Sequence, residues 1–107
     1  MILKKSQLAK AVRLLQTRLK PEAIYLFGSQ VSGLAKLEEG DVDFCVIVAD
    51  DKDPYREAVE AYDSLRAMPF PKDIIVRRKS RFEKRSNWPY TLEHEVRQTG
   101  RIVYPHE

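Results

Sequence analysis

The seven residues from Val42 to Val48 limit the possible folds more than any other part of the sequence. They read Val-Asp-Phe-Cys-Val-Ile-Val, and such a run of β-branched and aromatic residues favours a β-strand. Beyond Asp43, apolar residues occupy both alternating faces of this strand, which is typical of a central strand covered on both sides. The sequence therefore predicts a sheet with helices packed against it, an α/β (α+β) architecture.

The segments on either side supply the other elements of such a domain. In the first of them, the apolar residues Leu8, Val12, Leu15 and Leu19 recur at helical spacing. The predicted elements, in chain order, are a helix capped by Ser6 and ended at Lys20 by Pro21, a strand over Ala23–Phe27, a helical turn over Val31–Leu37, the strand Val42–Val48, a helix from the Asp53-Pro54 cap through Arg66, a strand over Asp73–Val76, a helix from Pro89 to Thr99 stopped by Gly100, and an extended tail over Ile102–Tyr104. This order predicts a small mixed sheet flanked by helices.

The length and composition narrow the class of protein further. The 107 residues contain no repeat or linker, which predicts a single domain over residues 1–107. The longest apolar run, Phe44–Ala49, is far shorter than the roughly 20 residues of a membrane span, so we expect no membrane contact and a cytoplasmic protein. One cysteine, Cys45, and two separated histidines form no zinc pattern, so any metal site would use oxygen ligands.

The residues that indicate chemistry lie around Gly28-Ser29 and Asp41-Val42-Asp43. A strand that ends in Gly-Ser and opens a helical turn presents backbone N–H groups and a hydroxyl, which suit the oxygens of a triphosphate. On a strand, Asp41 and Asp43 point to one face about 6.6 Å apart, so their carboxylates can converge on a hard cation such as Mg²⁺. Taken singly, a Gly-Ser turn is often only a turn, and an Asp-x-Asp at a strand start is often a solvated cap.

Together these motifs resemble a known family. The run Gly28-Ser29-Gln30-Val31-Ser32-Gly33-Leu34-Ala35, followed by Asp41-Val42-Asp43-Phe44, is similar to the signature of the minimal nucleotidyltransferases, the antitoxin-type members of the DNA polymerase beta-like nucleotidyltransferase superfamily. The resemblance implies a polymerase beta-like fold and a Mg²⁺-dependent reaction. It also implies that Gly28 and Ser29 hold the nucleotide phosphates and that Asp41 and Asp43 bind the metal.

The resemblance implies a third catalytic carboxylate on a neighbouring strand, and Asp73 matches that position. Asp73 would be a metal ligand and the group closest to the incoming hydroxyl, where it could assist deprotonation. Taken without the resemblance, it is equally well a residue that starts a strand. Gln30 and Ser32 stand where the family often has arginine, and the segment between Gly33 and Asp41 is one residue longer than the family pattern, so nucleotide affinity is the property to test.

The basic character of the chain is concentrated between Arg77 and Arg85, which carry six cations and one acid. Such a run is often a solvated loop; it could also be a docking surface for an acidic protein or its bound RNA, or a clamp for the triphosphate. We expect contact with nucleic acid only through this segment (Arg77, Arg78, Lys79 and Arg81). The Cys45 thiol is expected to be buried and structural, His94 to lie at the surface, and Tyr62 to belong to the core or its rim.

The function implied by the resemblance is transfer of AMP from ATP to a tyrosine hydroxyl of a partner protein. The partner would be a ribonuclease toxin of the HEPN (higher eukaryotes and prokaryotes nucleotide-binding) type, and the chain its antitoxin. A domain this small has little surface for a second substrate, which fits an acceptor supplied by a partner. The alternative is a non-catalytic module that neutralises or scaffolds its partner by contact alone. The base preference, the number of nucleotides transferred, the acceptor residue and the stoichiometry do not follow from the sequence.

Overall fold

A mixed β-sheet forms the middle layer of the molecule. The computed structural model describes residues 4–28 and 41–105, and the predicted helical turn over residues 31–37 lies outside them. In the described residues the sheet has four strands in the order β3-β2-β1-β4. These are β1 (Ala23–Phe27), β2 (Val42–Val48), β3 (Lys72–Arg78) and β4 (Arg101–Tyr104). β1 runs antiparallel to both of its neighbours, whereas β2 and β3 are parallel. β2 is therefore an interior strand, as its apolar sequence predicts.

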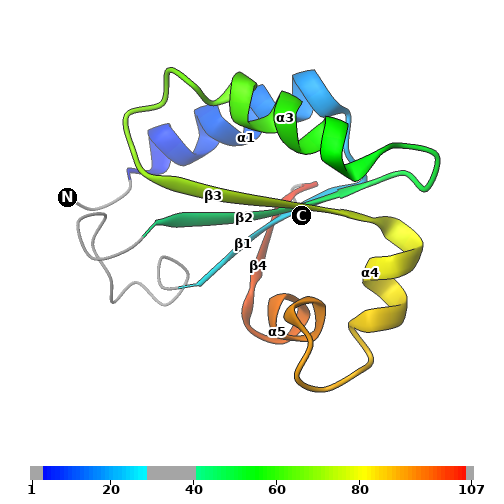
Figure 1. Ribbon diagram of the computed structural model, residues 1–107. Helices are drawn as coiled ribbons and strands as arrows, with labels where there is room; N and C mark the ends of the chain where they lie inside the picture. Colours follow the sequence, from blue (N-terminus) through cyan, green and yellow to red (C-terminus); the bar gives the residue numbers. More distant parts are fainter. Residues whose placement is uncertain (1–3, 29–40, 106–107) are drawn as a thin grey trace.

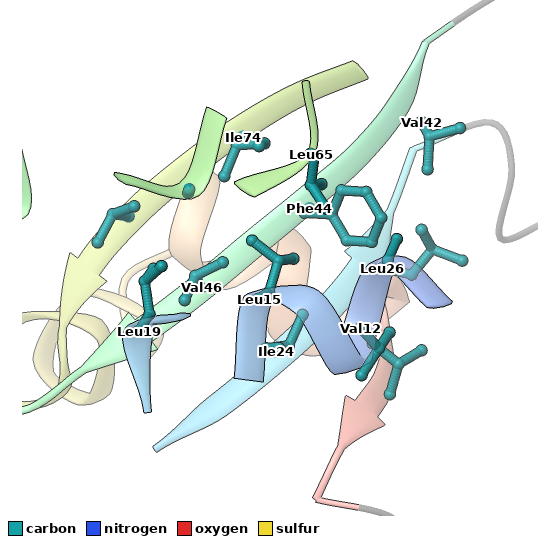
Figure 2. Packing of buried hydrophobic residues seen from close by; sticks show 14 of the residues in the cluster. Val12, Leu15, Leu19, Ile24, Leu26, Val42, Phe44, Val46, Leu65 and Ile74 are labelled. Carbon is teal, nitrogen blue, oxygen red and sulfur yellow. The ribbon is translucent and has the colours of Figure 1, made fainter. Parts of the chain in front are cut away.

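Helices cover both faces of this sheet (Figure 1). α1 (Lys5–Leu19) and α3 (Pro54–Ser64) lie on one face, and α4 (Lys79–Arg85) and α5 (Leu92–Thr99) lie on the other. Figure 2 shows the first interface, where Val12, Leu15 and Leu19 of α1 pack against β1 and β2. The second interface is smaller and is built around Cys45, Ile47, Phe82 and Val96. This arrangement confirms the predicted fold class.

The helix starts and ends follow local signals, with one correction. Asp53 caps α3 as predicted, since its side chain accepts a hydrogen bond from the Tyr55 N–H at 3.0 Å. The prediction that Ser6 caps α1 is wrong, because the helix begins at Lys5 and the Gln7 side chain accepts a hydrogen bond from the Lys4 N–H at 3.1 Å. A glutamine three residues after the cap position satisfies that N–H without a serine cap. α1 ends at Leu19, and Lys20 takes a left-handed conformation before Pro21.

Other boundaries differ from the prediction as well, and β4 begins at Arg101 rather than Ile102. α3 ends at Ser64 rather than Arg66, where the Ser64 hydroxyl donates to the Ala61 carbonyl at 2.7 Å and competes with the helical pattern. β3 is longer than predicted because Arg77 and Arg78 continue its pairing with β2. α5 starts at Leu92 because the Thr91 side chain accepts a hydrogen bond from the His94 N–H.

The basic segment is not a solvated loop. Its first two residues belong to β3 and the rest form α4. The only apolar side chain of α4, Phe82, is 4% exposed and packs under the sheet with its ring centre 5.4 Å from that of Tyr25. One buried aromatic ring therefore fixes the inner side of a helix whose other residues are polar. No helix in the described part of the chain is long and apolar enough to cross a membrane.

Candidate functional site

Asp43 and Asp73 lie side by side where β2 and β3 begin. The parallel register pairs them directly, so both side chains point to the same face of the sheet. Asp41 is exposed and stands just before β2. The fold therefore brings the three predicted aspartates to one end of the sheet; their roles as catalytic groups and metal ligands stay a prediction.

Gly28 follows β1 and lies against the Asp43 carboxylate. Its φ of +79° belongs to the left-handed region, which favours glycine. A Cβ atom placed on Gly28 would lie 2.2 Å from Asp43 Oδ2, closer than any real contact allows. The turn predicted to hold phosphates thus begins in contact with a predicted metal ligand. Ser29, the other predicted phosphate-binding residue, lies outside the described residues.

Tyr62 of α3 holds Asp73 in place, a role that the sequence did not reveal. Its hydroxyl donates to Asp73 Oδ1 at 3.0 Å and accepts from the Ile74 N–H at 2.9 Å. Because β3 is an edge strand, this N–H would otherwise lack a partner in the sheet. Helical spacing placed Tyr62 on the same side of α3 as Ala58 and Leu65, but no local pattern indicates that the ring reaches around the sheet edge.

The electrostatics of this acidic end are set by burial and by neighbouring acids. Burial, together with the negative charges of Asp73 and Asp41, raises the pKa of Asp43 to about 6. Burial also raises the pKa of Tyr62, and its contact with Asp73 acts in the same direction. A positive charge at this end would relieve the repulsion between the aspartates.

The donor set suits a hard cation, although the described residues alone do not complete the site. Within residues 4–28 and 41–105, no group of three His, Cys, Asp or Glu side chains is arranged to hold a metal ion. The available ligands are carboxylate oxygens, which Mg²⁺ prefers, and Mg²⁺ is commonly held by one or two carboxylates together with substrate phosphates and water. The residues therefore fit a cation that arrives with a nucleotide.

A second carboxylate, Glu93 of α5, is surrounded by arginines of the basic segment. Its side chain is 3% exposed and lies 3.1 Å from Arg77 Nε, 3.3 Å from Arg85 Nε and 3.7 Å from Arg81 Nε. Burial alone would raise the pKa of Glu93, but hydrogen bonds from its own backbone N–H, Arg77 and Arg85 outweigh burial and lower it. Much of the basic segment thus serves to hold α4 and α5 together.

The remaining basic residues predicted to contact nucleic acid also have partners within the chain. Arg78 Nε donates to the Lys52 carbonyl at 2.8 Å, and Lys79 Nζ lies 3.7 Å from Glu22. Both residues lie at the C-terminal end of β3, about 16 Å along the strand from Asp73. This separation does not support α4 as a clamp for a triphosphate held near Asp43.

Two other candidate residues lie away from the acidic end. Cys45 is fully buried, and burial raises the pKa of its thiol to about 12, so it is a structural thiol as predicted. His94 is half-buried rather than at the surface, since its Nδ1 lies 2.8 Å from the Ser86 carbonyl oxygen. Neither residue contributes to the site.

Comparisons with known proteins agree with this fold. The family model described as "Polymerase beta, Nucleotidyltransferase" matches residues 9–107. A crystal structure of the MntA-HpeT toxin-antitoxin, in a mutant where two aspartates two positions apart are replaced by glutamate, has 19% identity and a TM-score of 0.63, covering 98% of this chain and 75% of that chain. A crystal structure of a toxin-antitoxin with AMP-PNP has 21% identity and a TM-score of 0.57, covering 98% of this chain and 76% of that chain. No curated protein gives a significant match.

Proposed function

This chain belongs to the polymerase beta nucleotidyltransferase family, and on that basis we propose that it transfers AMP from ATP to a tyrosine hydroxyl of a partner protein. We further propose that the partner is a HEPN-type ribonuclease toxin, that the chain is its antitoxin, and that the reaction takes place in the cytoplasm, where ATP is available. The observation that carries the proposal is the direct pairing of Asp43 with Asp73, beside a glycine turn that closely approaches Asp43.

Each residue of the acidic end has a proposed role. Gly28 and Ser29 would contact the phosphates of ATP through backbone N–H groups and a hydroxyl. Asp41, Asp43 and Asp73 would hold Mg²⁺. When bound, Mg²⁺ would neutralise the carboxylates and the phosphates and so favour attack on phosphorus. The absence of an ion pair for Asp43 among the described residues and the close approach of Gly28 support this assignment.

Asp73 is proposed to receive the proton of the acceptor. In the transfer, the acceptor oxygen bonds to the α-phosphorus of ATP, the bond from that phosphorus to pyrophosphate breaks, and the acceptor proton moves to a carboxylate oxygen. The hydrogen bond from Tyr62 occupies Asp73 Oδ1, which leaves Oδ2 for this purpose. Tyr62 would act as a positioning residue, because its hydroxyl holds Asp73 by a hydrogen bond.

The surface beside Tyr62 supports a protein acceptor. Tyr55 and Val59 lie on the same side of α3 as Tyr62, at helical spacing, and are 86% and 67% exposed. Exposed apolar side chains grouped in this way are typical of protein contacts. The similarity to two toxin-antitoxin structures, one of them with AMP-PNP, also supports a protein partner and a nucleotide substrate.

The decisive experiment compares wild type with the double variant Asp41→Asn/Asp43→Asn. The purified protein is mixed with Mg²⁺, labelled ATP and the product of the neighbouring gene, and the label on that product is followed by mass spectrometry. Loss of both carboxylates should remove several kcal/mol of transition-state stabilisation and reduce transfer about a hundredfold or more. Asp51→Asn, an exposed aspartate after β2, is the matched control and should leave transfer unchanged.

The same experiment distinguishes the enzyme from a binding module. The absence of arginine at positions 30 and 32 favours a module that neutralises its partner by contact alone. In that case wild type adds no adenylyl mass to the partner, and the double variant protects the partner as fully as wild type does. These two results together would replace the catalytic proposal with the binding one.

A further inference from the structure

The outer side of α4 carries a basic surface that the proposed reaction does not use. Ser80, Arg81, Lys84, Arg85 and Trp88 line an open pocket of about 300 Å³. Ser80, Arg81, Lys84 and Arg85 repeat at the spacing of one helix face and form a stripe along it. Trp88 follows the end of α4, and its ring extends the stripe by contacts with Lys84 and Arg85. We call these five residues the α4 basic surface.

Among the residues that the structure describes, no acidic side chain lines this surface. Glu83, the one acid of α4, lines a different pocket together with Phe82 and Lys79. Glu93 lies buried beneath the helix, where it neutralises part of the charge of the arginines around it. Arg81 stays 60% exposed and its nearest carboxylate contact is 3.7 Å long, and Lys84 is exposed. The stripe therefore presents net positive charge to a ligand.

An exposed tryptophan ends the stripe. Trp88 is 47% exposed, with Lys84 Nζ and Arg85 Cζ each 5.7 Å from its ring centre. Tyr90, two residues further, is fully exposed as well. Cations alone would attract any acidic partner, but a large exposed ring flanked by cations also offers a base a stacking partner next to groups that bind its phosphate.

From this combination we propose that the α4 basic surface binds single-stranded nucleic acid. A single strand is favoured over a duplex because only an unpaired base can stack on Trp88. The surface lies at the opposite end of β3 from Asp73 (Figure 1), so it binds independently of the transfer site. Of the residues predicted to contact nucleic acid, Arg77, Arg78 and Lys79 have partners within the chain. We therefore assign the contact with nucleic acid to the α4 basic surface instead.

The test uses the fact that Trp88 is the only tryptophan of the chain. A single-stranded RNA of about 12 nucleotides, within the range that small binding domains cover, should quench Trp88 fluorescence in a saturable manner. The affinity should fall as salt rises, since phosphate contacts release counterions. A duplex of the same sequence should bind more weakly and quench less.

Variants locate the binding by the anisotropy of a fluorescein label on the RNA. Trp88→Ala should weaken binding about tenfold, and Lys84→Glu should weaken it at least as much. Lys10→Glu, which makes the same charge change on the exposed side of α1, should have little effect. Circular dichroism checks that each variant is folded, as expected for exposed positions.

Several results would overturn the proposal. One is the absence of saturable quenching; another is an equal loss of affinity in Lys84→Glu and Lys10→Glu, which would mean attraction by net charge only. A third is displacement of the RNA by polyglutamate with the same quenching of Trp88, which would assign the surface to an acidic protein. None of these measurements involves ATP or transfer, so the outcome is separate from that of the proposed enzyme.

Discussion

Two carboxylates of this domain, Glu93 and Asp43, are partly or wholly buried, but the charges of their neighbours have opposite signs. Glu93 is almost completely buried, yet three arginines surround it and its pKa is lowered. Asp43 is only half-buried, yet its neighbours include two other aspartates and its pKa is raised to about 6. The two sites lie on the same face of the sheet but at different ends of it.

The difference separates a structural acid from one proposed to be functional. Where a carboxylate holds two helices together, the sequence supplies its counter-charges from β3 and α4. At the start of β2, the described residues provide no ion pair for Asp43, and the repulsion between neighbouring acids destabilises the folded state. Such uncompensated charge is typical of a site completed by a ligand.

The strongest test of this comparison removes the charge of Glu93. Glu93→Gln keeps an oxygen acceptor and the side-chain shape, but it leaves three arginines around a neutral group. We expect the free energy of unfolding to fall by about 2–3 kcal/mol, at or below the low end of the roughly 3–5 kcal/mol for breaking a buried ion pair, because the arginines can still reach water. Urea denaturation at pH 7 measures the change.

Glu95→Gln is the matched control, because it lies on the same first turn of α5 and is exposed. Since the pKa of Glu93 is lowered in the folded state, its contribution is complete above the unfolded-state pKa, near 4.5, and is lost as the pH falls through the folded-state pKa. The difference between wild type and Glu93→Gln should therefore shrink in acid. Equal stability of the two proteins at pH 7 would mean that the arginine cluster does not stabilise the fold.

The two sites also differ in how far the sequence could predict them. β1 and β2 were predicted to the residue, because apolar runs bounded by turn residues are a local signal. The Asp-x-Asp pattern likewise placed Asp41 and Asp43 at the start of a strand, and the prediction of Asp73 relied on the family resemblance. The fold class followed from the same local patterns.

The basic segment could not be predicted in the same way. Its charge run is typical of a solvated loop, whereas α4 forms because Phe82 is buried and because Glu93, far along the chain, receives the arginines. The hydrogen bond between Tyr62 and Asp73 also depends on how α3 packs along the edge of β3. Contacts of this kind join residues distant in sequence, and a local pattern contains no information about them.

A glycine substitution sharpens the comparison at the acidic end. In Gly28→Ala the new Cβ would meet Asp43 Oδ2 and the residue would keep a positive φ, so both the turn and the carboxylate must shift. We expect a loss of about 1–2 kcal/mol in the free energy of unfolding. ATP affinity in the presence of Mg²⁺, measured by calorimetry, should fall as well.

Gly100→Ala is an informative control for this substitution. Its Cβ would lie 2.4 Å from the Val96 carbonyl oxygen, which is also too close, but φ is negative there and the residue lies between α5 and β4. It should therefore lower stability and leave ATP affinity unchanged. If both alanine variants bound ATP as wild type does, the turn after β1 would not be part of a nucleotide site.

The smallest expected effect concerns how much the ionised Asp43 carboxylate lowers the free energy of unfolding. Because its folded-state pKa, about 6, lies above the unfolded value near 3.8, the unfolded chain ionises first as the pH rises. The contribution of Asp43 to stability is therefore most favourable below pH 4. It becomes less favourable between about pH 4 and 6 and does not change above pH 6.

Asp43→Asn removes the charge, so without divalent ions it should be more stable than wild type at pH 7.5, by about 1 kcal/mol after allowance for solvent screening. Thermal unfolding at pH 4 should show no difference, and Asp51→Asn should show none at either pH. Adding Mg²⁺ with ATP at pH 7.5 should stabilise wild type more than Asp43→Asn and narrow the gap. An asparagine variant less stable than wild type at pH 7.5 without divalent ions would mean that the chain itself compensates Asp43, as it does Glu93.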